Sequence, residues 1–80
     1  MRTTLEKIAT EAASRLIETF RGSARVSNEM DDFAEVTYKP GVECTYDNII
    51  QTAMLYVDDE LVRINHVYIG GLVIIQFFRK

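Results

Sequence analysis

The residue types that most often carry enzyme chemistry are scarce in this chain of 80 residues. Cys44 is its only cysteine and His66 its only histidine. A zinc site needs three or four ligands, and a cysteine nucleophile needs an orienting third group and an oxyanion hole. No spacing in the sequence supplies either arrangement, so we interpret Cys44 as a small apolar residue and His66 as a half-buried strand residue. We therefore expect a protein that is not an enzyme and that has no cofactor and no metal ion.

Carboxylates are concentrated in the middle of the chain. The segment from Val26 to Glu60 holds nine of the twelve aspartates and glutamates, but only Lys39 among the nine lysines and arginines. Its formal charge is therefore −8, whereas the whole chain has a net charge of −3, which leaves +5 for the remainder. Such a separation of charge creates a field that attracts a basic partner and repels nucleic acid.

The spacing of these carboxylates does not support two familiar chemical uses. An EF-hand needs acidic residues at alternate positions, a glycine at the sixth and a glutamate at the twelfth. A catalytic acid–base pair needs an apolar pocket that separates the two pKa values, whereas these carboxylates lie in predicted polar turns. They are either solvated charges that prevent edge-to-edge pairing of strands, or parts of a recognition surface.

Tyrosines accompany the acidic residues, and this combination suits the recognition of an arginine-rich or lysine-rich surface. The alternative for the tyrosines is ordinary packing within strands. We predict a partner-binding surface made of both residue types: Glu29, Asp31, Asp32, Glu35, Tyr38, Glu43, Tyr46, Asp47, Tyr56, Asp58, Asp59 and Glu60. The expected partner is a larger protein or complex with a basic surface.

Direct binding to nucleic acid or to a membrane is not expected. Gly70-Gly71 lacks the further glycines and the lysine of a phosphate-binding loop, and the isoelectric point is about 5.0. The longest apolar run, Val67 to Phe78, has about 12 residues, fewer than the roughly 20 that span a bilayer as a helix. The lone cysteine and the absence of a secretory pattern at the start favour a cytoplasmic protein.

The hydrophobic pattern changes from helical to strand-like along the chain. Apolar residues recur at spacings of three and four between Thr4 and Arg21, which predicts a helix that ends before Gly22. Alternating or β-branched segments predict strands at residues 33–39, 49–57, 61–68 and 72–78, and the alternation is weaker at residues 24–30. The breaks between them predict turns at Pro40-Gly41, Asp58-Asp59 and Gly70-Gly71.

These elements predict one α+β domain over residues 1–80. We expect one N-terminal amphipathic helix packed on a three- to four-stranded antiparallel β-sheet arranged as a meander. A single helix covers one sheet face, so apolar residues of the last two strands must remain on the other face. Such a face marks a partner or a self-association surface, and a homodimer is therefore also expected as an alternative.

In size, acidity and layout the chain resembles the small phage-encoded inhibitors of bacterial defence, in particular the anti-CRISPR proteins. The acidic pieces from Glu29 to Glu35 and at Asp58-Asp59-Glu60 carry this resemblance, which involves no shared motif. It implies a non-enzymatic, phage-encoded inhibitor in the host cell cytoplasm that docks its acidic face on a basic nucleic-acid-binding surface of a host defence complex. The alternative function is a structural or adaptor module that homodimerises through its apolar sheet face.

Overall fold

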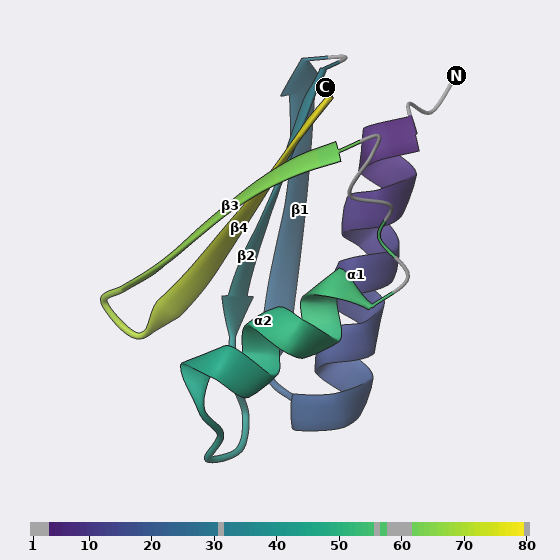
Figure 1. The fold of residues 1–80 in the computed structure, drawn as a ribbon. Helices are drawn as coiled ribbons and strands as arrows, with labels where there is room; N and C mark the ends of the chain where they lie inside the picture. The colour runs from purple at the N-terminus through teal and green to yellow at the C-terminus, as the bar shows by residue number, and fades with distance from the viewer. Residues whose placement is uncertain (1–3, 31, 56, 58–61, 80) are drawn as a thin grey trace.

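The computed structural model describes residues 4–30, 32–55, 57 and 62–79, with Thr4 and residues 28–30 described by their backbone only (Figure 1). Its elements are two helices and four strands: α1 (Thr4–Phe20), β1 (Ser23–Met30), β2 (Phe33–Lys39), α2 (Tyr46–Met54), β3 (Val62–Ile69) and β4 (Leu72–Arg79). The predicted α+β class, with an N-terminal helix packed on an antiparallel sheet, is confirmed.

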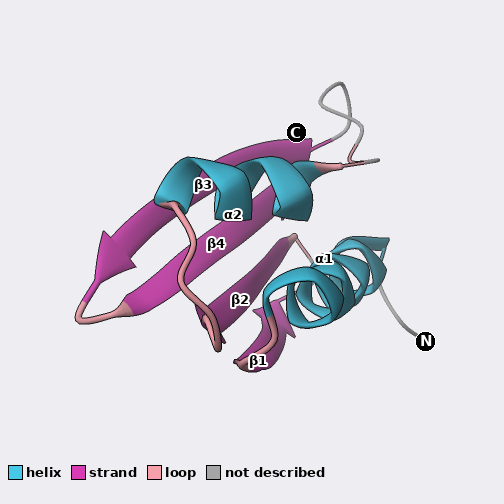
Figure 2. Cartoon of the chain, turned by 90° about the horizontal axis from the view of Figure 1, so that it is seen from below, coloured by secondary structure: helices cyan, strands magenta, loops and turns pink. Residues whose placement is uncertain are grey.

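Both helices lie on the same side of one four-stranded antiparallel sheet, in the strand order β1-β2-β4-β3 (Figure 2). Alternate residues of the two central strands are fully buried beneath them: Ala34, Val36 and Tyr38 of β2, and Val73, Ile75 and Phe77 of β4. The period-2 alternation of a strand places these side chains on one face. The hydrophobic core is therefore a single layer between this face and the helices.

Helix α1 forms where the sequence predicts it and ends at Phe20, one residue earlier than expected. Its apolar stripe is buried in the core at Leu5, Ala9, Ala12, Ala13 and Leu16. Arg21 (φ 58°) and Gly22 (φ 86°) then adopt the left-handed conformation that commonly ends a helix. A side chain at residue 22 would meet the carbonyl oxygen of Lys39 at 2.0 Å, so this close approach also requires glycine.

The prediction of a strand at residues 49–57 is wrong, because the chain forms helix α2 from Tyr46 to Met54. The side chain of Thr45 caps this helix by accepting a hydrogen bond from the backbone N–H of Asn48 at 3.2 Å. Ile49, Ile50 and Ala53 face the core, a spacing of one and three residues that fits one face of a helix.

The second helix changes the order of the strands, so the sheet is not the predicted meander. After β2 the chain passes through α2 and does not return to pair with β2. Strand β3 instead forms the edge of the sheet, and β4 lies between β2 and β3. The hairpin joins β3 to β4 through Gly70 (φ 59°) and Gly71 (φ 80°), which confirms the turn predicted there. The predicted turn at Asp58-Asp59 lies outside the described residues.

No helix among the described residues covers the opposite face of the sheet. The cross-strand partners place Phe33, Phe78 and Arg63 in one row on this face, and Glu35, Gln76 and Asn65 in the next. The next row joins Thr37, Ile74 and Val67, and Ile69 pairs with Leu72 beyond it; Val67 and Ile69 are exposed. In the described part of the chain, no helix is long and apolar enough to cross a membrane.

Candidate protein-binding surface

Three aromatic side chains meet where the start of α2 lies against the edge strand β3. The hydroxyl oxygen of Tyr46 lies 2.5 Å from Nδ1 of His66. The ring centroids of Tyr46 and His66 are 5.4 Å apart, and the ring of Tyr68 meets that of Tyr46 edge-on, with centroids 5.9 Å apart. These contacts join residues that are far apart in sequence into one aromatic cluster.

Local sequence places each member of this cluster. Thr45 caps α2 and thereby fixes Tyr46 as the first residue of the helix. His66 and Tyr68 alternate along β3, opposite the buried residues Ile75 and Val73 of β4, and so they share the helix-covered face of the sheet. At this edge the cover is incomplete, and both His66 and Tyr68 are exposed.

The hydroxyl of Tyr46 is held in its neutral form. Partial burial raises the pKa of Tyr46, and the nearby carboxylate of Asp47 raises this pKa further. The phenol therefore keeps its proton at neutral pH, and it donates to His66 whenever Nδ1 carries no proton. The hydrogen bond fixes the orientation of the Tyr46 ring, which reduces the entropy lost when a partner packs on it.

Acidic and apolar side chains are exposed beside this cluster. Asp47 follows Tyr46 in the first turn of α2, and Glu43 lies in the loop that leads into the helix. Tyr68 is itself one of the most exposed large apolar residues of the described chain (56%), whereas Val67 (50%) and Ile69 (60%), at the same end of β3, lie on the uncovered face of the sheet. We call the set of Glu43, Tyr46, Asp47, His66 and Tyr68 the Tyr46 surface.

The other predicted partner-binding residues do not all join this surface. Asp32 is exposed just before β2, at the end of that strand opposite to Glu43 and Asp47. Glu35 lies on the uncovered face of the sheet, where its carboxylate accepts a hydrogen bond from the side-chain amide of Gln76 at 3.0 Å. The predicted partner-binding carboxylates whose side chains are described are thus divided between three places. The side chain of Glu29 and the whole of Asp31, Tyr56, Asp58, Asp59 and Glu60 lie outside the described residues.

Tyr38 does not serve partner binding, contrary to the sequence-based prediction, because it is fully buried. Its hydroxyl lies 3.2 Å from the carbonyl oxygen of Leu16 and also contacts the carbonyl oxygen of Arg21. These contacts tie β2 to the last turn of α1. The physical reason is the alternation of β2, which places Tyr38 on the same face as Ala34 and Val36.

No group of three or more histidine, cysteine, aspartate or glutamate side chains is close enough to hold a metal ion in the part of the chain described. Cys44 is a free thiol, partly buried against the core. The Tyr46 surface offers aromatic faces, one hydrogen-bonded imidazole and exposed carboxylates.

Sequence reasoning missed the pairing of Tyr46 with His66, although it selected Tyr46 and Asp47. A signal was present, because Thr45 followed by Ile49, Ile50 and Ala53 has the pattern of a capped amphipathic helix. The contact itself depends on how α2 packs across β3, which no local pattern encodes.

No protein-family model, curated protein or solved structure matches this chain. The contacts and charges of its own residues are therefore the basis for assigning a function.

Proposed function

We propose that the protein is a small, non-enzymatic binding protein that docks the Tyr46 surface on a basic surface of a larger protein. Where that basic surface binds nucleic acid, docking covers the surface, and the protein acts as an inhibitor of nucleic-acid binding. The observation that supports this proposal most is the ordered aromatic cluster of Tyr46, His66 and Tyr68 beside the exposed carboxylates of Asp47 and Glu43.

The composition of the surface fits a cationic partner. Aromatic faces attract arginine and lysine through the ring quadrupole, an effect worth about 0.5 to 2 kcal/mol for each contact. Tyrosines held in place by packing are also frequent energetic centres of interfaces. Exposed carboxylates at the rim add steering and charge complementarity, which raise the association rate and depend on salt.

The proposal extends to the biological setting that the resemblance implies. For a phage-encoded inhibitor of the anti-CRISPR type, binding alone is sufficient, because occupying a nucleic-acid-binding surface needs no catalysis. The exposed carboxylates of Glu43 and Asp47 support competition with phosphate for the same cations.

Capture of a host protein, followed by competition, tests this proposal. The immobilised protein should retain a host protein with a basic surface, and both moderate salt and a double-stranded oligonucleotide should release it. The double variant Glu43→Lys, Asp47→Lys should lose this capture. Glu18→Lys is the matched control, because Glu18 is exposed on α1 outside the Tyr46 surface. Equal capture by both variants would show that the Tyr46 surface does not bind the partner. Release of the partner without salt or competitor would show the same.

A structural module that homodimerises is the second candidate function. The observation that favours it is the uncovered sheet face with its exposed residues Val67 and Ile69. Sedimentation at low and high salt distinguishes the two functions. A dimer that is insensitive to salt and is dissociated by Val67→Lys would support the module, whereas a monomer under both conditions excludes it.

A further inference from the structure

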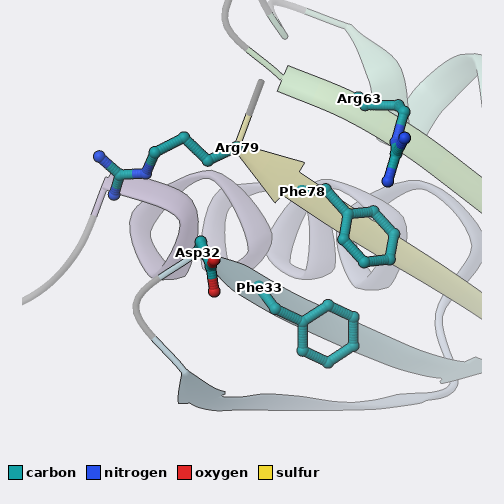
Figure 3. A pocket seen from close by; sticks show the side chains of 5 residues that line it. All are labelled: Asp32, Phe33, Arg63, Phe78 and Arg79. Atoms are coloured by element: carbon teal, nitrogen blue, oxygen red, sulfur yellow. The ribbon is translucent and has the colours of Figure 1, made fainter.

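A second aromatic site lies on the uncovered face of the sheet, at the opposite end of β4 from the hairpin (Figure 3). Phe33 of β2 and Phe78 of β4 are cross-strand partners, and their ring centroids are 5.1 Å apart. The guanidinium of Arg63, which pairs with Phe78 from β3, lies 5.0 Å from the centroid of the Phe78 ring. With Asp32 and Arg79 these residues line an open hollow of about 480 Å³.

Arg63 is the cation that points toward the two rings. Figure 3 shows its side chain directed at Phe78, whereas the side chain of Arg79 extends away from both rings. Within the described residues no carboxylate forms an ion pair with Arg63, and its side chain is exposed. A guanidinium held over a ring keeps its donors available, and it suits bidentate pairing with a phosphate.

The next row of the same face supplies hydrogen-bonding groups. Gln76 and Asn65 are cross-strand partners, one alternation along their strands from Phe78 and Arg63. Gln76 already donates to Glu35 at 3.0 Å, and so its amide is oriented on the surface. The edge of a flat ligand that packs on the phenylalanine rings therefore meets the hydrogen-bond donors and acceptors of these two amides.

We propose that this hollow binds a nucleoside 5′-monophosphate. The base packs against Phe33 and Phe78, its edge meets Gln76 and Asn65, and its phosphate pairs with Arg63. Aromatic stacking of bases on an exposed antiparallel sheet beside a cation is a general mode of nucleotide recognition. The volume lies within the range of about 300 to 1,000 Å³ that small-molecule sites occupy. The amide row favours a nucleobase over a simple aromatic acid, which has no hydrogen-bonding edge.

The hollow is suited to a single nucleotide and not to a long strand. The acidic residues Asp32 and Glu35 adjoin the hollow and the amide row respectively, and they repel the further phosphates of a polynucleotide. This site is therefore consistent with the expectation that the protein does not bind nucleic acid directly. It is also independent of the Tyr46 surface, from which it differs in residues and in sheet face.

Calorimetric titration with adenosine 5′-monophosphate tests the proposal. We expect saturable binding that is at least about tenfold tighter than that of adenosine, phenyl phosphate or inorganic phosphate. Adenosine lacks the phosphate, phenyl phosphate lacks the hydrogen-bonding edge of a base, and inorganic phosphate lacks both the ring and that edge. Equal affinity for phenyl phosphate would overturn the assignment of a nucleobase. An absence of binding by the monophosphate would overturn the site itself.

Variants locate the binding. Arg63→Gln and Phe78→Leu should each weaken binding of the monophosphate by about tenfold or more. Arg25→Gln is the matched control, because Arg25 lies on the same uncovered face but pairs with Thr37, two rows away from Phe33. Asp32→Asn should strengthen binding slightly by removing a negative charge at the rim. Circular dichroism of each variant establishes that it is folded, and a folded Arg63→Gln variant with unchanged affinity would contradict the proposal.

Discussion

The two aromatic clusters of this small domain differ in nearly every respect. The cluster around Tyr46 lies near the β3–β4 hairpin on the helix-covered side, and carboxylates adjoin it. The cluster of Phe33 and Phe78 lies at the other end of the strands on the uncovered face, with an arginine over one ring. The carboxylates beside the first cluster are the basis for proposing a cationic partner, and the arginine over the second is the basis for proposing an anionic ligand.

This difference gives the uneven charge of the chain a structural meaning. Asp47 and Glu43 come from the strongly acidic middle segment, whereas Arg63 comes from the basic remainder. The fold places Glu43 and Asp47 toward the hairpin end of β3 and β4 and Arg63 at the other end, where Asp32 and Glu35 of the acidic segment also lie. The charge next to each aromatic cluster thus sets the class of ligand that we propose for it. Four variants can separate the two clusters or remove both.

The largest expected effect is the loss of the core that supports both clusters. Phe77 is fully buried in β4 and pairs with Ala34 and Ile64. Phe77→Ala should lower the free energy of unfolding by about 3 to 5 kcal/mol, because it removes buried apolar area and leaves a cavity. Urea denaturation measures this loss. Ile17→Ala, at a partly exposed position of α1, is the control and should lower the free energy of unfolding much less. Similar losses of stability in the two variants would show that Phe77 is not central to the core.

Tyr38→Phe should separate a structural tyrosine from a binding one. It removes the hydroxyl that contacts the carbonyl oxygens of Leu16 and Arg21, and should cost about 1 to 2 kcal/mol of stability. Binding at both clusters should be unchanged in the folded protein. Tyr46→Phe should behave in the opposite way, with a small loss of stability and a measurable loss of partner binding. If Tyr38→Phe impairs partner binding while Tyr46→Phe does not, the roles given to these tyrosines are reversed.

Thr45→Ala should affect only one cluster. The substitution removes the N-cap of α2 and should cost about 1 kcal/mol, because the N–H of Asn48 loses its side-chain partner. The start of the helix that carries Tyr46 becomes less ordered, so partner binding should weaken while nucleotide binding at Arg63 persists. Thr19→Ala, at an exposed position of α1, serves as the control. Parallel losses at both clusters would show that they are coupled through the fold.

The smallest effect concerns alkaline pH. Burial raises the pKa of Tyr38 in the folded protein, with a further contribution from Cys44, and the pKa of Tyr46 is raised as well. The folded state therefore holds these protons more tightly than the unfolded state. The stability from this source is complete below a pH of about 10 and is lost as the pH rises through the folded-state pKa values. Urea denaturation across this range should show the decline, and Tyr38→Phe should reduce it; an identical pH dependence in the variant would exclude Tyr38 as its source.

The elements with strong periodicity could be predicted from the sequence. Helix α1 and strand β2 form almost where apolar spacing places them, and the Gly70-Gly71 turn joins two strands as expected. Helix α2 could not be identified from residue types alone, because its residues Ile49, Ile50 and Tyr46 also favour strands. Its helical state depends on the cap at Thr45 and on packing of Ile49 and Ala53 against the core.

The candidate sites depended on this missed helix. Asp47 and Tyr46 could be selected from composition, but their meeting with His66 and Tyr68 requires α2 to lie against β3. Tyr38 was assigned to the surface because composition does not show which parity of β2 faces the helices. The row of Phe33, Phe78 and Arg63 likewise depends on the strand order β2-β4-β3, since a meander would place β3 next to β2.

The most direct test of this division is a pair of nuclear magnetic resonance titrations on the isotope-labelled protein at low salt. An arginine-rich peptide should shift the backbone amide signals of Tyr46, Asp47 and Tyr68, and adenosine 5′-monophosphate should shift those of Phe33, Arg63 and Phe78. Neither ligand should displace the other. Shifts of the same amides by both ligands, or displacement of one ligand by the other, would contradict the existence of two aromatic sites of opposite charge preference.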